Sequence, residues 1–533
     1  MALARRRPLP PASSPSTAPR ARKDASASGR PPSPPPLWLA LRLPVFALQV
    51  FGPTTAPFAV IVGEGAQRTV VAANAAATAL GVRTGHGISA ALALAPTLAL
   101  APRAPQREAA ALARLAAWSQ QFTPLVSLEP PDALLLELRG SLKLFGGLAA
   151  LIARLQLALT PLGYSAVLAV APTPRAALWF ARAGVDQRLD DASALPGALG
   201  ALPLAAIGLD PKLVAALAGI GVHQVRDALR LPRGDLGRRY GPRLRAELDR
   251  ALGRLPEPRA AFVAPLRFCG TLELVYEYSA SGPLAAAAAR LTAELCGGLA
   301  ARGHGVRRLL LTLEHRVGIE AVAPTIVLLG LLAPTRDPRH LDRLLYENLA
   351  RTPLAGPVRA LRLEALEVEP LAAAPLALFD ARQAAGAAVA ADPAPLIDAL
   401  RARLGPERVH GLSCVADHRP EYAWREIGIR VNFVTAEVCP PAALAKLTLI
   451  PISVRPTWLL AEPQPLATLR GRPRWRGASL ELMQGPERIE SGWWDGADIA
   501  RDYYQAQAAD GARLWVFRTR QKPAAWFLHG LFA

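Results

Sequence analysis

Residues 127–147 read SLEPPDALLLELRGSLKLFGG, and this stretch decides the fold. The apolar runs at 126–128 and 134–138 predict two short strands, because turn-forming residues separate them. The Pro-Pro-Asp sequence at 130–132 is typical of a tight turn. The stretch therefore predicts a pair of adjacent strands, followed by a helix at 147–159.

The sequence on both sides continues this alternation of strands and helices. We expect strands at 37–43, 58–62, 69–73 and 166–171, and helices at 74–100 and 174–183. Such an alternation predicts a mixed sheet covered by helices. The first body is therefore of α/β or α+β class and spans residues 37–190.

The length of the chain requires several such bodies, because 533 residues are too many for one hydrophobic core. We predict a multidomain chain, divided by changes in composition and pattern. Its parts are a disordered N-terminal extension at 1–36, the first body at 37–190, a helical module at 191–260, a strand–helix–strand–strand–helix–strand (βαββαβ) module at 261–370, an Ala/Pro-rich linker at 371–398 and a C-terminal region at 399–533.

The charge of the chain favours a polyanionic partner. The formal net charge is +19, and nearly all of the positive charge is arginine. Nucleic acid is the first candidate partner, and an acidic membrane surface is the second. No apolar run reaches the ~18 residues that a membrane span needs, so we expect no membrane-spanning segment.

The four cysteines indicate neither a metal site nor a disulfide framework. Cys269, Cys296, Cys414 and Cys439 form no CxxC pair, and no His/Cys cluster has zinc spacing. We therefore expect free thiols in a reducing cytoplasm, and neither a metal nor another cofactor.

The module at 191–260 contains a helix-hairpin-helix pattern. An expected helix at 211–218 meets Gly219-Ile220-Gly221, and a second helix begins near His223. We expect the glycines to permit a tight hairpin whose backbone N–H groups face a phosphate. A helical hairpin that binds no DNA is the plainer interpretation. The DNA-binding candidates are Gly219, Ile220, Gly221, Arg226, Arg230, Arg238 and Arg239, with Arg233, Arg243 and Arg245 close by in the sequence.

The order of these modules resembles that of Y-family DNA polymerases, in which a palm with fingers precedes a helix-hairpin-helix thumb and a βαββαβ little finger. The segment 69–85, which contains VVAANAAATALGVRTG, resembles the fingers of that family. The stretch 127–147 resembles its second palm motif. The resemblance covers about residues 37–370, and it implies the fold of that family and binding of primer-template or damaged DNA.

The positions that match the metal ligands of this family have lost most of their carboxylates. Ala40 stands where the resemblance places the first metal-binding acid, and Arg42 follows two residues later. A cation at this place repels Mg²⁺. In the second motif Glu129 is the acid that remains, and its neighbour is Pro130. A single carboxylate binds Mg²⁺ poorly.

The positions that match the triphosphate contacts have changed as well. The fingers of the family place a Tyr and an Arg on the triphosphate, and these positions match Ala75 and Thr78. The palm lysine that reaches the triphosphate falls near Leu178. Together with the metal positions, these changes imply a non-catalytic homologue of the polymerases, without bound metal or nucleotide.

Two other functions remain open. The first is an active translesion polymerase that uses Glu129, Asp132 and Glu137, but the first strand offers it no acid. The second is a stand-alone helix-hairpin-helix protein of DNA repair. A pure DNA binder has no need of the aromatic-rich C-terminal region.

The C-terminal region carries the composition of a docking module. It holds seven of the ten tryptophans. Two of its stretches, GLSCVADHRPEYAWR at 411–425 and ERIESGWWDGADIARDYYQ at 487–505, resemble the polymerase-like component of the bacterial SOS mutasome. That resemblance implies two partners, the RecA-like accessory protein ImuA and the error-prone polymerase ImuC. Aromatic side chains among charges are typical of interface hot spots. The partner-binding candidates are Trp493, Trp494, Tyr503 and Tyr504.

The linker contains a short apolar segment, Pro375-Leu376-Ala377-Leu378-Phe379. It resembles the peptides that bind the sliding clamp, although Pro375 replaces their Gln. Such peptides insert apolar side chains into a groove of the partner. Leu376, Leu378 and Phe379 are therefore the clamp-binding candidates.

Overall fold

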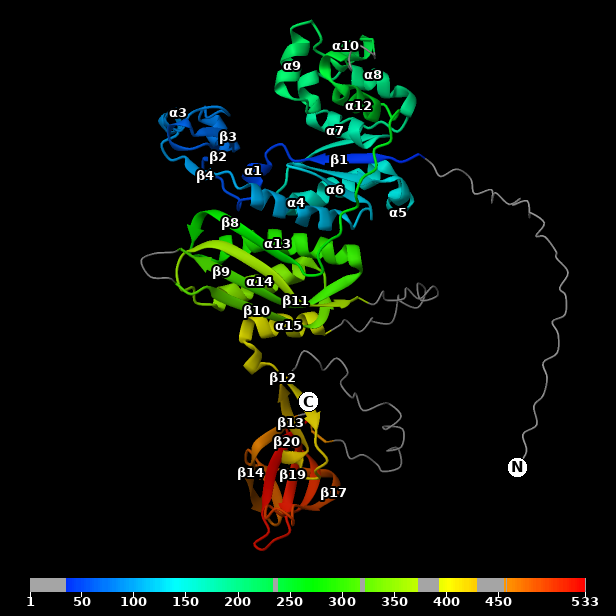
Figure 1. Cartoon of the computed structure of the whole chain (residues 1–533). Helices are drawn as coiled ribbons and strands as arrows, with labels where there is room; N and C mark the ends of the chain where they lie inside the picture. Colours follow the sequence, from blue (N-terminus) through cyan, green and yellow to red (C-terminus); the bar gives the residue numbers. More distant parts are fainter. Residues whose placement is uncertain are drawn as a thin grey trace, which may run out of the picture.

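The computed structural model describes residues 35–232, 238–316, 322–371, 393–428, 455–456 and 458–532. Figure 1 shows a palm sheet with a helical thumb on one side and a little-finger module on the other. A small fingers-like sheet lies at one end of the palm, and a C-terminal β domain lies beyond the little finger. This arrangement agrees with the one that the resemblance to Y-family polymerases implies, with an added C-terminal domain.

The palm is a four-stranded antiparallel sheet in the order β5-β6-β1-β7. Three helices pack on one face, and a fourth packs on the other. The strands are β1 (Trp38–Arg42), β5 (Val126–Glu129), β6 (Ala133–Glu137) and β7 (Val167–Ala171), and the helices are α1 (Phe46–Gln49), α4 (Pro105–Ser119), α6 (Leu148–Leu159) and α7 (Pro174–Arg182), with the short α5 (Leu142–Phe145) before α6.

Both faces of the palm sheet are covered, because its strands are apolar on both sides. Successive side chains of a strand point to opposite faces. Leu39 and Leu41 join the core under α4 and α6. Trp38 and Ala40 join the core formed with α7 and the thumb. The thumb is thus packed on the sheet through a continuous hydrophobic core.

The fingers-like body differs from the helix expected at 74–100. It contains α2 (Ala75–Ala79) and α3 (Ile88–Leu94), followed by β4 (Ala99–Pro102). Gly81 and Gly85 separate the two helices with φ of 93° and 91°, a conformation that ends a right-handed helix. β4 pairs in parallel with β2 (Phe58–Val62), which also pairs with β3 (Thr69–Ala73).

The thumb is a compact set of short helices. Its buried side chains share a core with α7. The helices are α8 (Leu195–Gly200), α9 (Pro211–Ala218), α10 (Val225–Arg230) and α12 (Pro242–Ala251), with the 3₁₀ turn η5 (Leu204–Ile207) before α9.

The little finger has the predicted βαββαβ order. Its antiparallel sheet runs β10-β9-β11-β8 and packs against two helices. The elements are β8 (Cys269–Tyr278), α13 (Ser281–Arg302), β9 (His304–His315), β10 (Thr325–Thr335), α14 (Pro338–Arg351) and β11 (Val358–Pro370).

Helix α13 has the length and apolar composition of a membrane span, alone among the unbroken helices of the described residues. Its most apolar window is 61% buried within the fold. It packs against α14 and against α4 of the palm. This degree of burial is typical of a core helix in a folded domain.

A further helix, α15 (Ala394–Leu404), extends the little finger beyond the predicted boundary at 398. Asp398, which is buried, accepts a hydrogen bond from the Leu332 backbone N–H at 3.1 Å. The guanidinium of Arg351 donates to the Ala402 carbonyl at 3.0 Å. A boundary between 398 and 399 would cut this helix, so we place the boundary after residue 404.

The C-terminal domain consists of a β-hairpin and a seven-stranded antiparallel sheet in the order β16-β15-β14-β20-β19-β18-β17. Both faces of the large sheet carry apolar clusters. The hairpin is β12 (His410–Cys414) and β13 (Trp424–Gly428), and the sheet contains β14 (Trp458–Leu469), β15 (Arg472–Trp475), β16 (Ala478–Ser479), β17 (Glu481–Ser491), β18 (Ile499–Gln507), β19 (Arg513–Thr519) and β20 (Trp526–Leu531).

The little finger is joined to the palm through a buried interface between α4 and α13. The Arg114 guanidinium meets the Glu294 carboxylate at 2.7 Å, and Glu294 is 1% exposed. The Arg290 guanidinium lies 4.5 Å from the ring centroid of Tyr164. Burial raises the pKa of Tyr164 to about 12. Gly297 of α13 lies directly against the indole of Trp118.

We expect Gly297→Ala to destabilise the protein, because the added Cβ would overlap the Trp118 ring. Overpacking of this kind costs about 1–3 kcal/mol. The neighbouring Gly298 has no atom within 4 Å of an added Cβ, so Gly298→Ala is the matched control. The control is expected to be neutral or stabilising, because Ala is favoured over Gly in helices by about 1 kcal/mol. Urea unfolding that gives both variants equal stability would contradict a close α4–α13 contact.

Candidate functional site

The strand pairing brings Arg42, Glu129 and Asp132 to one end of the palm sheet, where the resemblance predicts metal-binding positions. Arg42 of β1 pairs with Ala133 of β6, and Ala133 pairs with Glu129 of β5. Asp132 lies in the turn between β5 and β6. Ala40 lies further along β1, is 0% exposed and packs in the core shared with α7. The side chain at position 40 therefore faces the packed interior.

Each of the two carboxylates at this end is paired with arginine. Arg42 Nε lies 3.0 Å from an oxygen of Asp132. Arg259 and Arg182 both reach Glu129, with N–O distances of 2.6 and 3.5 Å. Arg42 also donates a hydrogen bond of 3.2 Å to the Arg182 carbonyl at the end of α7, where a helix favours positive charge. We call Arg42, Arg182, Arg259, Glu129 and Asp132 the arginine lock.

The arginine lock continues into a second group of ion pairs beside α7. Arg259 also meets Glu257 at 2.6 Å. Glu257 is shared with Arg175, which reaches Glu247 of α12 at 3.1 Å. Burial lowers the pKa of Arg182. Strands of the palm, helix α7, the thumb and the segment after α12 are thus joined by charge pairs.

The segment that supplies Arg259 lies along the edge of the palm sheet. The Phe262 backbone N–H donates to the Val126 carbonyl of β5 at 2.7 Å. The Gln120 side chain of the palm donates to the Phe262 carbonyl at 2.8 Å. These contacts fix the connection between thumb and little finger to the edge strand, and they hold Arg259 beside Glu129.

This donor set does not fit Mg²⁺. The ion needs several oxygen ligands in octahedral geometry, and guanidinium groups already use the oxygens of Glu129 and Asp132. Glu137 lies opposite Trp38 at the other end of β6 and accepts hydrogen bonds from the Leu37 and Arg139 backbone N–H groups. Among the described residues, no group of three or more His, Cys, Asp or Glu side chains is placed to hold a metal.

The positions that match the triphosphate contacts offer no polar group suited to a nucleotide. Ala75 and Thr78 are exposed on α2, with an apolar and a short side chain. Leu178 is 0% exposed in the core of α7 and faces no solvent. The chain has no charged side chain at any of the three positions.

The sequence reasoning missed the roles of Arg182 and Arg259. Arg182 ends α7, four residues after Leu178, so its position near the palm motif was a usable signal. Arg259 lies 130 residues from Glu129 in the sequence. No local pattern indicates that contact.

The thumb has the predicted helix-hairpin-helix at Gly219–Gly221, between α9 and α10. The hydrogen bonding of its backbone N–H groups differs from our expectation. Those of Gly219, Ile220 and Gly221 donate to carbonyls of α9 at 3.0–3.1 Å. Asp227 accepts from the N–H groups of His223 and Gln224 at the start of α10. The prediction that this hairpin offers free N–H groups to a phosphate is therefore wrong.

A carboxylate thus stands where the second helix would have received a phosphate. The bond from the Gln224 N–H holds the pKa of Asp227 below its usual range, so the group stays charged. The two glycines also differ from each other. Gly221 has φ of 82°, whereas Gly219 is in ordinary helical conformation with φ of −61°. Only Gly221 requires glycine for its backbone geometry.

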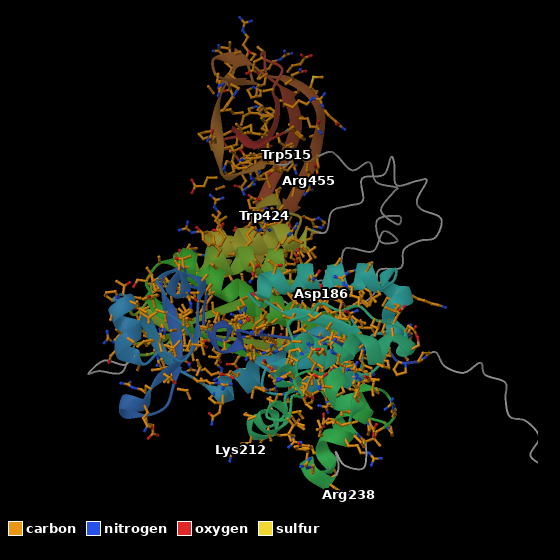
Figure 2. All side chains as sticks on the ribbon, turned by 90° about the horizontal axis from the view of Figure 1, so that it is seen from above. Asp186, Lys212, Arg238, Trp424, Arg455 and Trp515 are labelled. Carbon is orange, nitrogen blue, oxygen red and sulfur yellow. The ribbon has the colours of Figure 1, made fainter. Side chains whose placement is uncertain are left out.

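Many arginines of the thumb have exposed side chains, although Arg226 lies 4.0 Å from Asp227 and Arg245 lies 3.8 Å from Asp249. Figure 2 shows Lys212 and Arg238 on the thumb, well separated from Trp515 of the C-terminal domain. A surface of exposed guanidinium groups neutralises phosphates without reading bases. The exposed arginines of the thumb among the described residues include Arg226, Arg230, Arg238, Arg239, Arg243 and Arg245.

The two C-terminal motifs come together in space. Arg419, from the loop of the β12–β13 hairpin, meets Asp417 at 2.8 Å and Asp495 at 2.7 Å. Its guanidinium also lies 5.6 Å from the Trp494 ring centroid. The motif at 411–425 and the motif at 487–505 thus form one structural unit.

The four aromatic candidates of this unit divide into two kinds. Trp493 and Trp494 are 81% and 57% exposed and pack edge to face. Tyr503 is 1% exposed and stacks on Trp515, and its hydroxyl lies 2.8 Å from Nδ1 of His529. Tyr503 is therefore a core residue, and its assignment as a contact residue is wrong. Tyr504 is half-buried and packs on the ring of Trp526.

The clamp-binding candidates Leu376, Leu378 and Phe379 lie outside the described residues. They remain a prediction from the sequence.

Comparisons with known proteins agree with this architecture. A family model described as IMS, the impB/mucB/samB family, matches residues 48–181. Two curated relatives, each called Protein ImuB, come from the NA1000 / CB15N and the ATCC 19089 / CIP 103742 / CB 15 strains of Caulobacter vibrioides. Each is 33% identical over 477 residues, which is 85% of this chain and 100% of the relative.

Solved structures of polymerases are also similar to this chain. An insertion ternary complex of Dbh DNA polymerase is 17% identical, with a TM-score of 0.37, and covers 62% of this chain and 98% of that chain. The crystal structure of DinB from Sulfolobus solfataricus is 18% identical, with a TM-score of 0.35 and the same coverage.

The fold and the matched segment at 48–181 define a polymerase-like protein of the impB/mucB/samB class. Within this class the two curated relatives are more specific. The chain belongs to the ImuB family, since the relatives match along their whole length.

We expect Glu129→Gln to lower the free energy of unfolding by about 1–3 kcal/mol, because it removes the charged partner of Arg182 and leaves Arg259 with Glu257 alone in a largely buried site. The matched control is Asp186→Asn, where an exposed carboxylate meets only the exposed Arg188. The control is expected to change stability by less than about 0.5 kcal/mol. Equal urea midpoints for both variants would mean that the arginine lock contributes nothing to stability.

Proposed function

We propose that this chain is a non-catalytic member of the ImuB family that works as a DNA-bound scaffold in error-prone translesion synthesis in the bacterial cytoplasm. The arginine lock is the observation that supports the proposal. In the arginine lock, guanidinium groups pair with the carboxylates at the place where a polymerase holds its metal ions. The positive charge of the guanidinium groups neutralises the negative charge of these carboxylates. The palm then keeps its shape without binding a metal or a triphosphate.

DNA binding is assigned to the thumb and the little finger. The exposed arginines of the thumb supply the attraction for phosphates, and Asp227 directs DNA away from the start of α10. The binding site is therefore made by side chains more than by backbone N–H groups. Such contacts give affinity with little sequence preference.

Partner binding is assigned to the chain beyond the polymerase-like body. Leu376, Leu378 and Phe379 bind the sliding clamp. The C-terminal domain binds ImuA and ImuC through a surface that includes Trp493 and Trp494. Trp493 and Trp494 are the large apolar side chains that the motif at 487–505 leaves exposed.

We expect no nucleotide incorporation by the purified chain with Mg²⁺ or Mn²⁺. The physical reason is that Arg42, Arg182 and Arg259 occupy the carboxylates that the ions would need. The measurement is primer extension on a labelled primer-template. The control is the Glu129→Gln variant, which separates true activity from a contaminating polymerase. Extension that is present in the wild-type chain and absent in the variant would restore the active-polymerase interpretation.

We expect a chain that ends after residue 404 to fold and bind primer-template DNA, but to lose ImuA and ImuC. Ending there keeps α15 on the little finger, where Arg351 and Leu332 bond to it. The measurement is co-purification of each partner, together with DNA binding by fluorescence anisotropy. The full-length Trp493→Ala/Trp494→Ala variant is the comparison within an intact fold. Co-purification of both partners with the shortened chain would move the docking surface into the polymerase-like body.

A further inference from the structure

The C-terminal domain carries two consecutive two-residue turns, each of which begins with arginine. Leu469 pairs with Arg472, which leaves Arg470-Gly471 as the turn between β14 and β15. Trp475 pairs with Ala478, which leaves Arg476-Gly477 as the turn between β15 and β16. We call residues 469–479 the double hairpin.

Both arginines adopt a backbone conformation that is unusual for their type. Arg470 has φ of 50° and Arg476 has φ of 49°, and the glycines that follow have φ of 80° and 84°. These are the only non-glycine residues with positive φ in the described part of the chain. Turns of this kind ordinarily place Asn, Asp or Gly first. The left-handed conformation costs arginine roughly 1–2 kcal/mol at each position.

The double hairpin also carries a high density of positive charge that no nearby carboxylate neutralises. Residues 470–476 contain four arginines, and residues 463–480 contain no Asp or Glu. Arg470, Arg472 and Arg476 are exposed, and no described carboxylate forms an ion pair with any of them. Arg474 differs, since it is half-buried and donates to the Gly477 carbonyl within the turn.

The shape of this element fits a groove better than a flat surface. The end of β14 is exposed on both sides, at Ala467, Thr468 and Leu469. The tip of the β14–β15 hairpin, from Leu469 to Arg472, is two-stranded, because β16 pairs with β15 only further along, at Arg474 and Trp475. The major groove of duplex DNA admits a two-stranded β-ribbon. Guanidinium groups match phosphate oxygens with two parallel hydrogen bonds.

We propose that the double hairpin is a second DNA-binding site, which holds the phosphate backbone of duplex DNA through Arg470, Arg472 and Arg476. It lies on the C-terminal domain, on the far side of the little finger from the thumb. The strained backbone at two arginines is kept because their side chains are needed at the tips of the turns. The site goes beyond the DNA contacts assigned to the polymerase-like body.

The test uses the full-length chain with the substitutions Arg470→Gly, Arg472→Gln and Arg476→Gly. Glycine relieves the left-handed strain, so the variant is expected to melt at the same temperature as wild type or higher. The matched control removes three exposed, unpaired arginines of the described residues elsewhere, with Arg408→Gln, Arg425→Gln and Arg513→Gln. Both variants lose three positive charges.

The measurement is binding of a fluorescent 40-base-pair duplex without a primer end, at several salt concentrations. The log–log salt slope of the hairpin variant is expected to be shallower by about 2.7, since each phosphate contact contributes about 0.9. The affinity of the hairpin variant for the duplex is expected to fall by roughly tenfold or more. The control variant is expected to keep the wild-type slope to within about one unit.

Three results would overturn the site. The first is a wild-type slope in the hairpin variant, and the second is an equal loss in the control, which would indicate net charge alone. The third is loss of binding to anionic lipid vesicles or to an acidic partner without loss of DNA binding. A thumb variant with Arg226→Gln and Arg230→Gln separates this inference from the proposed function. If that variant loses affinity and the hairpin variant does not, only the double hairpin is refuted.

Discussion

The ion pairs of Arg42 with Asp132, and of Arg259 and Arg182 with Glu129, are the constraint on which the polymerase-like body depends. Adjacent carboxylates repel each other unless a cation lies between them. A polymerase supplies metal ions for this purpose, and this chain supplies guanidinium groups from three separate elements. The replacement is structural as well as electrostatic, because the arginines come from β1, from the end of α7 and from the segment after the thumb. Charge neutralisation therefore also sets where the thumb and the little finger lie.

Buried contacts join the thumb and the little finger to the palm. The thumb shares a core with Ala40 and the α7 face of the palm sheet, and the little finger packs on the other side through α4 and α13. Buried polar pairs such as Arg114–Glu294 admit little sliding, because a shift would leave a charge unpaired in the interior. The thumb, the palm and the little finger are therefore held together by contacts that are costly to break.

The sequence was sufficient for the order of most helices and strands, including the βαββαβ order of the little finger, because this order follows from local pattern. It was insufficient wherever a long-range contact decided the outcome. Arg259 reaches Glu129 across 130 residues. Asp227 takes the N–H groups at the start of α10, which no hairpin motif reveals. Tyr503 has the sequence surroundings of a hot spot, yet alternation along β18 turns it into the core. The single helix expected at 74–100 is interrupted at Gly81 and Gly85, because their positive φ ends a right-handed helix even in an alanine-rich segment.

Arginine has two opposite uses in this chain, and burial separates them. In the palm, guanidinium groups are paired and largely enclosed, so they contribute little to the field that a distant polyanion experiences. On the thumb many of them are exposed and some pair with acids such as Asp227 and Asp249, whereas Arg470, Arg472 and Arg476 of the double hairpin are exposed and pair with no described carboxylate. A net charge of +19 counts both kinds equally. Attraction for DNA is instead set by the unpaired, exposed fraction, since only those charges release counterions when a phosphate approaches. Arg470 and Arg476 belong to this exposed fraction. Their side chains are retained there although the left-handed backbone conformation is unfavourable for arginine.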